Sequence, residues 1–160
     1  MTDDVTLIIN PAVQEKLPDA LAQKAIVMAN GDIQIVGPIS VEAIPAYNIR
    51  EEALNYHPKG RDNGYVLETD GFRMYISGDT EDTPEMRALT DIDIAFVSMN
   101  LPFTMPIENA ASGVSTFAPK TVIPYHFRGS DRLSDVEYFQ ELVQAENPEI
   151  NVILHNWYQE

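Results

Sequence analysis

The pattern of apolar and polar positions changes near residue 79. Before that point, short apolar runs separated by turn residues are typical of strands. These runs occupy residues 5–9, 25–29, 33–36, 39–44, 64–69 and 72–76. A helix with proline at its first position is expected over residues 11–17. We expect the strands to form an antiparallel meander, because turn signals such as Asp70-Gly71 join neighbouring runs.

After residue 79, strands and helices alternate. Thr83 and Pro84 have the order of an N-cap and a first helical residue, and they predict a helix that begins there. Further helices are expected over residues 106–117 and 134–145, and strands over 92–97, 121–123 and 150–154. The second half therefore has a β-α-β-α-β order, and the whole chain is predicted to be of mixed α/β class.

Residues 45–63 fit neither pattern. This stretch contains Tyr47, Asn48 and His57, together with several charged residues. A loop of this length in a compact domain is usually functional or folded locally. We therefore treat it as a source of candidate site residues.

The composition narrows the class of protein. A length of 160 residues with 44% hydrophobic residues suits one domain, spanning residues 1–160. The formal net charge is −15, from 25 acidic against 10 basic residues, which disfavours nucleic-acid binding. No apolar run is long enough to cross a membrane, and we expect a cytoplasmic protein. The chain has no cysteine, so a metal site would need His, Asp or Glu ligands.

Three potential ligands lie just beyond the ends of apolar segments or in the long loop. They are His57, Asp79 after the strand at 72–76, and His126 after the strand at 121–123. Two imidazoles and a carboxylate suit zinc, iron or manganese. Their spacing has no local signature, so on spacing alone hydrogen-bonding histidines and an aspartate that caps a helix are the favoured explanation.

Three motifs in order resemble those of the metallo-β-lactamase superfamily. They are Tyr56-His57-Pro58-Lys59-Gly60 with the following Gly64-Tyr65-Val66, then Ser77-Gly78-Asp79-Thr80, then Pro124-Tyr125-His126. The likeness is greatest to the branch of metal-dependent hydrolases that includes ascorbate-phosphate-lactonase-like proteins. The resemblance implies an αββα sandwich, here incomplete, in which an antiparallel meander precedes alternating strands and helices.

The resemblance also implies a metal site. His57, Asp79 and His126 would be the ligands, with Asp79 as the carboxylate that bridges two metals. The expected ion is zinc, with manganese or iron as alternatives. Tyr47 and Asn48 would lie where members of the family line the pocket. Tyr125, beside His126, could orient a substrate, although aromatic packing is the favoured explanation for it. No residue is assigned a catalytic role.

One departure from the family pattern changes the expectation. The family carries a His-x-His-x-Asp-His motif near its first strands, and this chain has only three histidines, His57, His126 and His155. We therefore expect a member that is truncated at its N-terminus, with an open sheet edge and an uncovered apolar face. A symmetric dimer, which we favour, or a separate chain that carries the missing half would cover both.

Two hypotheses on function follow. In the first, the chain is related to metal-dependent hydrolases and has a partial metal site, poor occupancy, and weak or absent activity. In the second, it is a non-catalytic remnant that acts as an oligomerising or binding module.

Overall fold

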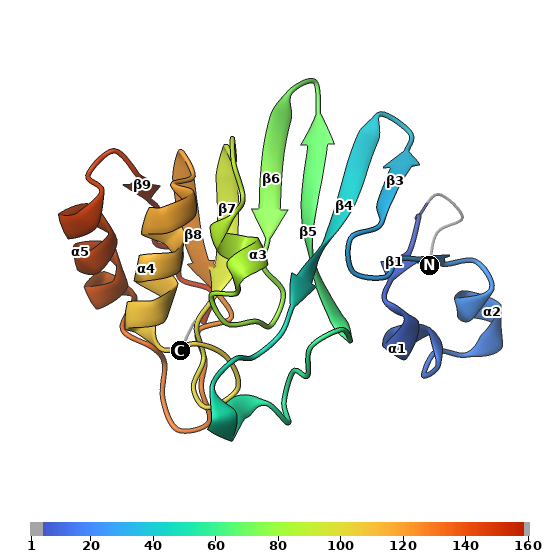
Figure 1. The fold of residues 1–160 in the computed structure, drawn as a ribbon, viewed down its shortest axis with the longest axis horizontal. Helices are drawn as coiled ribbons and strands as arrows, with labels where there is room; N and C mark the ends of the chain where they lie inside the picture. The colour runs from blue at the N-terminus through green and yellow to red at the C-terminus, as the bar shows by residue number, and fades with distance from the viewer. Residues whose placement is uncertain (1–4, 159–160) are drawn as a thin grey trace.

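A mixed sheet of seven strands forms the centre of the molecule in the computed structural model, which describes residues 5–158 (Figure 1). The strands follow one another across the sheet in chain order. They are β3 (Ile33–Val36), β4 (Ile39–Ala46), β5 (Asp62–Thr69), β6 (Phe72–Ile76), β7 (Ile94–Ser98), β8 (Thr121–Tyr125) and β9 (Asn151–Val152). Pairing is antiparallel from β3 to β6 and parallel from β6 to β9. The predicted change from meander to alternating strands and helices is confirmed.

Helices cover one face of the parallel half of the sheet. Figure 1 shows α3, α4 and α5 in front of the strands β6 to β9. Their bounds are α3 (Pro84–Arg87), α4 (Ile107–Phe117) and α5 (Val136–Glu146). The predicted helices at 83–86, 106–117 and 134–145 are thus confirmed.

The ends of these helices follow from local chemistry. The Thr83 side chain accepts a hydrogen bond from the backbone N–H of Met86, and Asp135 does the same for Tyr138. Each satisfies a backbone donor that has no partner inside the helix. Helix α4 ends at Phe117, and the next residue, Ala118, has a φ of 45° that takes the chain out of the helix before Pro119.

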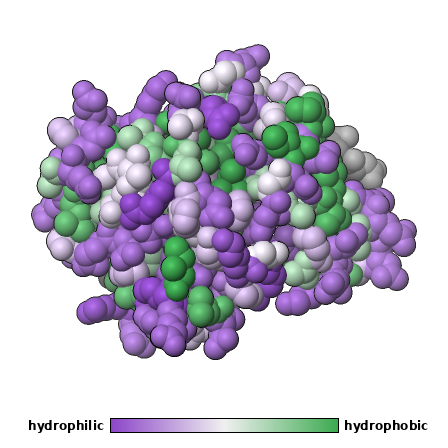
Figure 2. Space-filling view, viewed as in Figure 1, coloured by the Kyte–Doolittle hydropathy of each residue, from purple (hydrophilic) through white to green (hydrophobic). Residues whose placement is uncertain are grey.

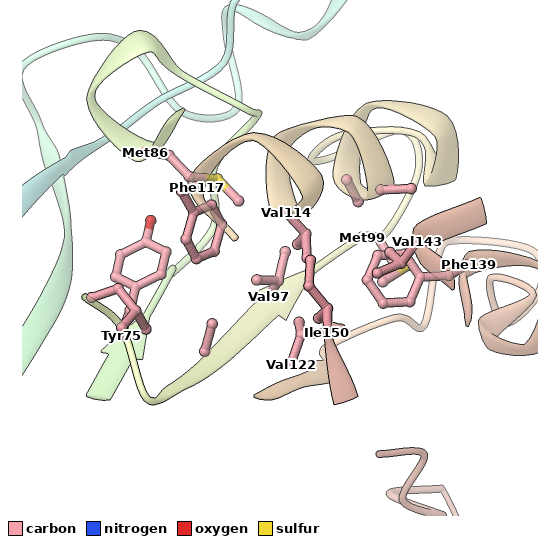
Figure 3. Close-up of a cluster of buried hydrophobic side chains, with 14 of the residues drawn as sticks. Tyr75, Met86, Val97, Met99, Val114, Phe117, Val122, Phe139, Val143 and Ile150 are labelled. Atoms are coloured by element: carbon pink, nitrogen blue, oxygen red, sulfur yellow. The ribbon is translucent and has the colours of Figure 1, made fainter. Parts of the chain in front are cut away.

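The main core lies between these helices and the sheet. Tyr75, Val97 and Val122 project from the strands toward Val114 of α4 and Phe139 of α5 (Figure 3). Tyr75 and Phe117 meet edge to face, with ring centroids 5.9 Å apart. Because strand side chains alternate between faces, this core uses only every second residue of β6, β7 and β8.

The first two strands do not join the meander, contrary to the prediction. β1 (Ile8–Ile9) and β2 (Ile26–Val27) pair with each other in parallel, in a separate two-stranded sheet. The short helices α1 (Pro11–Gln14) and α2 (Asp19–Ala22) connect them. A hairpin turn cannot join parallel strands, whereas a crossover of this kind can.

The small sheet packs on the other face of the antiparallel half. There, Met28, Val41 and Ala43 form a second buried cluster, against which Ile8 and Ile26 of the small sheet lie. On the same face farther along, Met74, Ile76, Ile94 and Phe96 are only half-buried.

The end of the sheet at β3 also has exposed apolar side chains. Ile33 is 61% and Ile35 71% exposed, and Figure 2 shows hydrophobic residues gathered over β3 and β4. Among the described residues, no helix has the length and hydrophobicity required to traverse a bilayer.

Candidate metal centre

Three neighbouring parallel strands end at one edge of the sheet, and each is followed by a polar residue of the site. Asp79 follows β6, Asn100 follows β7 and His126 follows β8. His57 comes from the loop between β4 and β5, which contains the 3₁₀ helix η1 (Glu51–Ala53). Strand ends that are fixed by the ladder place such side chains reproducibly.

Two glycines allow the start of β5 to approach the end of β6. A Cβ on Gly64 would lie 2.5 Å from the Ser77 carbonyl oxygen, and one on Gly78 would lie 2.7 Å from that of Asn63. Gly78 also has a φ of +63°, which glycine adopts without a steric penalty. This close approach leads the chain directly into Asp79.

The two histidines contact different oxygens of Asp79. His126 Nδ1 lies 2.7 Å from Asp79 Oδ1, within hydrogen-bond distance. His57 Nε2 lies 3.5 Å from Asp79 Oδ2. The three predicted ligands therefore come together, with the carboxylate between the two imidazoles.

Asp62 is the other partner of His57. Its Oδ2 lies 3.1 Å from His57 Nδ1, and its carboxylate also accepts hydrogen bonds from Arg61 and from the Asn10 side chain. Partial burial alone would raise the pKa of Asp62. The hydrogen bonds from Arg61 and His57 outweigh that effect, and the pKa is lowered. An ionised Asp62 accepts a hydrogen bond from His57 Nδ1, so that Nε2 is the nitrogen that faces Asp79.

Asn100 is the other partner of His126. Its side-chain nitrogen lies 3.2 Å from His126 Nε2. Its side-chain oxygen accepts a hydrogen bond of 2.6 Å from the Thr104 hydroxyl. Asn100 and Thr104 are both buried.

The loop that carries His57 is held by a buried carboxylate. Glu81, 1% exposed, accepts hydrogen bonds from the backbone N–H groups of Ile49 and Arg50 and from the Arg50 side chain. Arg50 also donates to the Thr104 carbonyl oxygen. The same contacts therefore connect the His57 loop to the segment that orients Asn100.

The residues predicted to bind substrate make other contacts. The Tyr47 hydroxyl donates to Glu85 and accepts from Lys59. Asn48 is buried, and its side-chain nitrogen donates to the carbonyl oxygens of Ala53 and Phe103.

Tyr125, beside His126, packs edge to face on Phe96 at 6.3 Å. Burial raises the pKa of its hydroxyl. Thus Tyr47, Asn48 and Tyr125 are each engaged with neighbouring protein groups.

A cavity of about 350 Å³ opens beside His57 and Asp79. Besides these two residues, its lining consists of Ala12, Val13, Lys16, Arg61 and Asp62. Ala12 and Val13 belong to α1 and Lys16 follows it, so this short helix and the residues just after it form one wall. Two cationic side chains lie next to the acidic centre at this point.

The donor atoms fit a metal ion only in part. Neighbouring ligand atoms of a tetrahedral zinc with bonds of about 2.0–2.2 Å are about 3.4 Å apart, close to the 3.5 Å between His57 Nε2 and Asp79 Oδ2. Within residues 5–158, no group of three or more His, Cys, Asp or Glu side chains could hold a metal ion by itself. The reason is geometric, because His57 and His126 flank opposite oxygens of the Asp79 carboxylate.

Sequence reasoning missed Asp62, Asn100, Thr104 and Glu81. Asn100 had a usable signal: it follows the strand that lies between those of Asp79 and His126. Glu81 had none, because nothing in its neighbourhood distinguishes a buried carboxylate from an exposed one.

Fold and site together define a mixed α/β protein with a histidine–carboxylate cluster at the ends of parallel strands. A family model described as "Beta-lactamase superfamily domain" matches residues 2–126. The chain therefore belongs to the beta-lactamase superfamily, as its motifs indicated.

Several relatives are named as metal-dependent hydrolases. A UPF0173 metal-dependent hydrolase of Archaeoglobus fulgidus is 26% identical over 79% of this chain and 58% of its own length. One of Thermococcus onnurineus is 30% identical over 72% of this chain and 53% of its own length. The chain thus spans about half the length of these relatives.

Solved structures show the same fold. A crystal structure from Parabacteroides distasonis, of a protein named as a metal-dependent hydrolase, has a TM-score of 0.85 and 38% identity over 98% of this chain and 66% of that one. A metallo hydrolase from Ignicoccus hospitalis has a TM-score of 0.75 at 19% identity, over 94% of this chain and 65% of that one. The predicted fold class is confirmed.

Proposed function

We propose that this chain is related to metal-dependent hydrolases and carries a partial site for a divalent metal ion at His57, Asp79 and His126. Zinc is the expected ion, and manganese and iron are the alternatives. The observation that carries the proposal is the Asp79 carboxylate with one imidazole at each oxygen, 2.7 Å and 3.5 Å away. The names of the relatives support a metal-dependent reaction.

The residues of the chain would act in distinct ways. Asp62 would orient His57, and Lys16 and Arg61 would attract an anionic part of a substrate into the cavity beside Asp79. A bound divalent ion would supply Lewis acidity for hydrolysis. Three ligands are enough for a catalytic zinc site, but hydrolysis also needs an activated water and a proton acceptor, and no residue is assigned the role of that base. We therefore expect weak or absent activity from this chain alone.

Metal content tests the proposal. We expect zinc, manganese or iron to co-purify or to bind at micromolar concentration, measured by elemental analysis and calorimetry. His57→Ala, His126→Ala and Asp79→Asn should each lower binding. His155→Ala is the matched control, because His155 packs edge-on against Trp157. Absence of binding in the wild type, or equal binding by all variants, would overturn the proposal.

A second candidate function is an oligomerising module. The half-buried apolar side chains on the face of β6 and β7 that the helices leave uncovered, Met74, Ile76, Ile94 and Phe96, favour it. The occupant we infer is a second copy of this chain, which would also cover the exposed apolar end at β3.

Light scattering tests this candidate directly. A dimer mass is expected at working concentration, and Ile94→Lys should shift it toward the monomer mass. Gln144→Lys, at an exposed position of α5, is the charge-matched control, because it also adds one positive charge. A monomer mass for the wild type would contradict the dimer.

A further inference from the structure

A single side chain, that of Arg61, joins the two ends of the short loop that carries His57. Its Nη2 donates a hydrogen bond of 2.6 Å to the carbonyl oxygen of Tyr56, the residue before His57. The same nitrogen donates one of 2.8 Å to Asp62 Oδ2, at the start of β5. Gly60, with a φ of +89°, allows the chain to turn back between these two contacts.

The Asp62 carboxylate extends these contacts to the imidazole of His57. Arg61 Nε lies 3.1 Å from each oxygen of that carboxylate, and Oδ2 lies 3.1 Å from His57 Nδ1. The contacts therefore form a closed ring, which runs from the Tyr56 carbonyl through Arg61 and Asp62 and ends on the neighbouring imidazole. Such a ring restricts both the backbone before His57 and the direction of its side chain.

The direction of the His57 imidazole depends on Asp62. The His57 carbonyl oxygen accepts a hydrogen bond of 2.8 Å from the backbone N–H of Asn48, which fixes the main chain but leaves the ring free to turn about its side-chain bonds. The contact with Asp62 selects the direction in which Nε2 lies 3.5 Å from Asp79 Oδ2. Asn10 also donates to the Asp62 carboxylate, but at 3.3 Å, which is longer than any contact from Arg61.

Arginine has the geometry that this position requires. Its planar guanidinium presents two nitrogens to one carboxylate and a further N–H to a carbonyl group, whereas lysine offers a single nitrogen. The side chains of Arg61 and Asp62 are 39% and 22% exposed, so their ion pair adds little to the stability of the fold. Within residues 5–158, Arg61 Nη1 makes no hydrogen bond. This nitrogen remains for the cavity beside Asp79, which Arg61 lines.

We propose that Arg61 is a positioning residue of the metal centre. It holds the Asp62 carboxylate and the backbone before His57, and it thereby directs His57 Nε2 toward the side of Asp79 at which a cation would bind. The consequence for metal affinity rests on the proposed metal site. The closure of the loop by Arg61 is a property of the metal-free protein and can be measured separately.

Zinc affinity, measured by calorimetry, tests the positioning role. Loss of a group that orients a metal ligand lowers metal affinity about 10–100-fold. Arg61→Lys keeps the charge but not the planar fork, and it should lower the zinc affinity by about tenfold and shift the absorption bands of bound Co²⁺. Arg132→Lys, at an exposed position of the loop between β8 and α5, is the matched control and should bind both ions as wild type does. Equal zinc affinity in the two variants would overturn the proposal.

A double-mutant cycle separates positioning through Asp62 from an independent effect of Arg61 on the fold. Asp62→Ala removes the partner of the imidazole, so Arg61→Lys should lower the zinc affinity by a smaller factor in that background than in wild type. The same factor in both backgrounds would contradict a role exerted through Asp62. The urea midpoint of Arg61→Lys should be close to that of wild type. A large fall in that midpoint would assign Arg61 to folding instead.

Amide exchange in chelator-treated protein tests the closure of the loop without any metal. The N–H groups of residues 56–60 should exchange faster in Arg61→Lys than in wild type, while those of β7 and β8 stay unchanged. If the wild type binds no zinc, the proposed metal site is refuted, and this comparison alone decides whether Arg61 holds the loop: equal exchange would overturn that role. If the wild type binds zinc and Arg61→Lys binds it equally well, the metal site stands and the assignment of Arg61 fails.

Discussion

The parallel and antiparallel halves of the large sheet are built differently. The parallel half, β6 to β9, is covered on one face by α3, α4 and α5, and its strand ends place Asp79, Asn100 and His126 directly. The antiparallel half leaves Ile33 and Ile35 exposed on β3. Its contribution to the site, His57, comes from a loop. One half of the site is thus positioned by strands, and the other depends on contacts that hold a loop in place.

The largest expected difference between the halves is in packing. Phe139→Ala empties a fully buried position between α5 and the sheet and should lower the free energy of unfolding by about 3–5 kcal/mol. Ile35→Ala, at a side chain 71% exposed, should change it by no more than about 0.5 kcal/mol. Urea unfolding monitored by circular dichroism measures both. Similar losses in the free energy of unfolding for the two variants would contradict the difference in packing between the two halves of the sheet. A large loss for Ile35→Ala would point to a partner that covers β3.

Removal of Glu81 tests how the His57 loop is held. Glu81→Ala leaves Arg50 and two backbone N–H groups without their buried acceptor and should cost about 3 kcal/mol. Amide exchange should increase in the loop before it increases in β7 or β8. The control is Glu52→Ala, at an Arg50 partner whose side chain is 68% exposed, with an expected cost below about 1 kcal/mol. Unchanged loop protection in Glu81→Ala would show that other contacts hold the loop.

Gly78 tests the junction between the two halves. Gly78→Ala adds a Cβ 2.7 Å from the Asn63 carbonyl oxygen at a φ of +63°, and should cost about 1–3 kcal/mol. Gly37→Ala is matched in backbone strain, with a φ of +58° and no atom within 4 Å of the new Cβ. Equal losses of stability for Gly78→Ala and Gly37→Ala in thermal unfolding would mean that the close approach of β5 and β6 adds nothing to the effect of a Cβ at residue 78.

The smallest expected effect concerns pH. Burial alone would raise the pKa of Glu85, but its own backbone N–H, Tyr47 and Lys59 hydrogen-bond to it and lower the pKa below 4.5. The ionised Glu85 carboxylate therefore makes its full contribution to stability above about pH 4.5. This contribution is lost as the pH falls through the lower pKa that Glu85 has in the folded protein. Glu85→Gln should be slightly less stable than wild type at neutral pH, and the difference should shrink in acid. If the stability difference between Glu85→Gln and wild type stayed constant from neutral to acidic pH, the ionised carboxylate of Glu85 would not be the source of that difference.

Much of the fold was predictable from the sequence because its signals are local. Apolar periodicity and helix caps such as Thr83 predicted α3, α4 and α5 and the order of the strands. Asp79 and His126 stood out because each follows an apolar run that forms a strand. These features depend on residues a few positions apart, which is the range over which a pattern carries information.

Only the tertiary structure decided which groups meet. The parallel pairing of β1 with β2, the carboxylate of Asp62 on His57, and the Asn100 amide on His126 are contacts that periodicity does not encode. Hydrogen-bond partners depend on the directions of side chains brought together by the whole sheet. The sequence by itself therefore determined the strand ends at which Asp79 and His126 lie. Tertiary packing determined that His57 and His126 contact different oxygens of the Asp79 carboxylate.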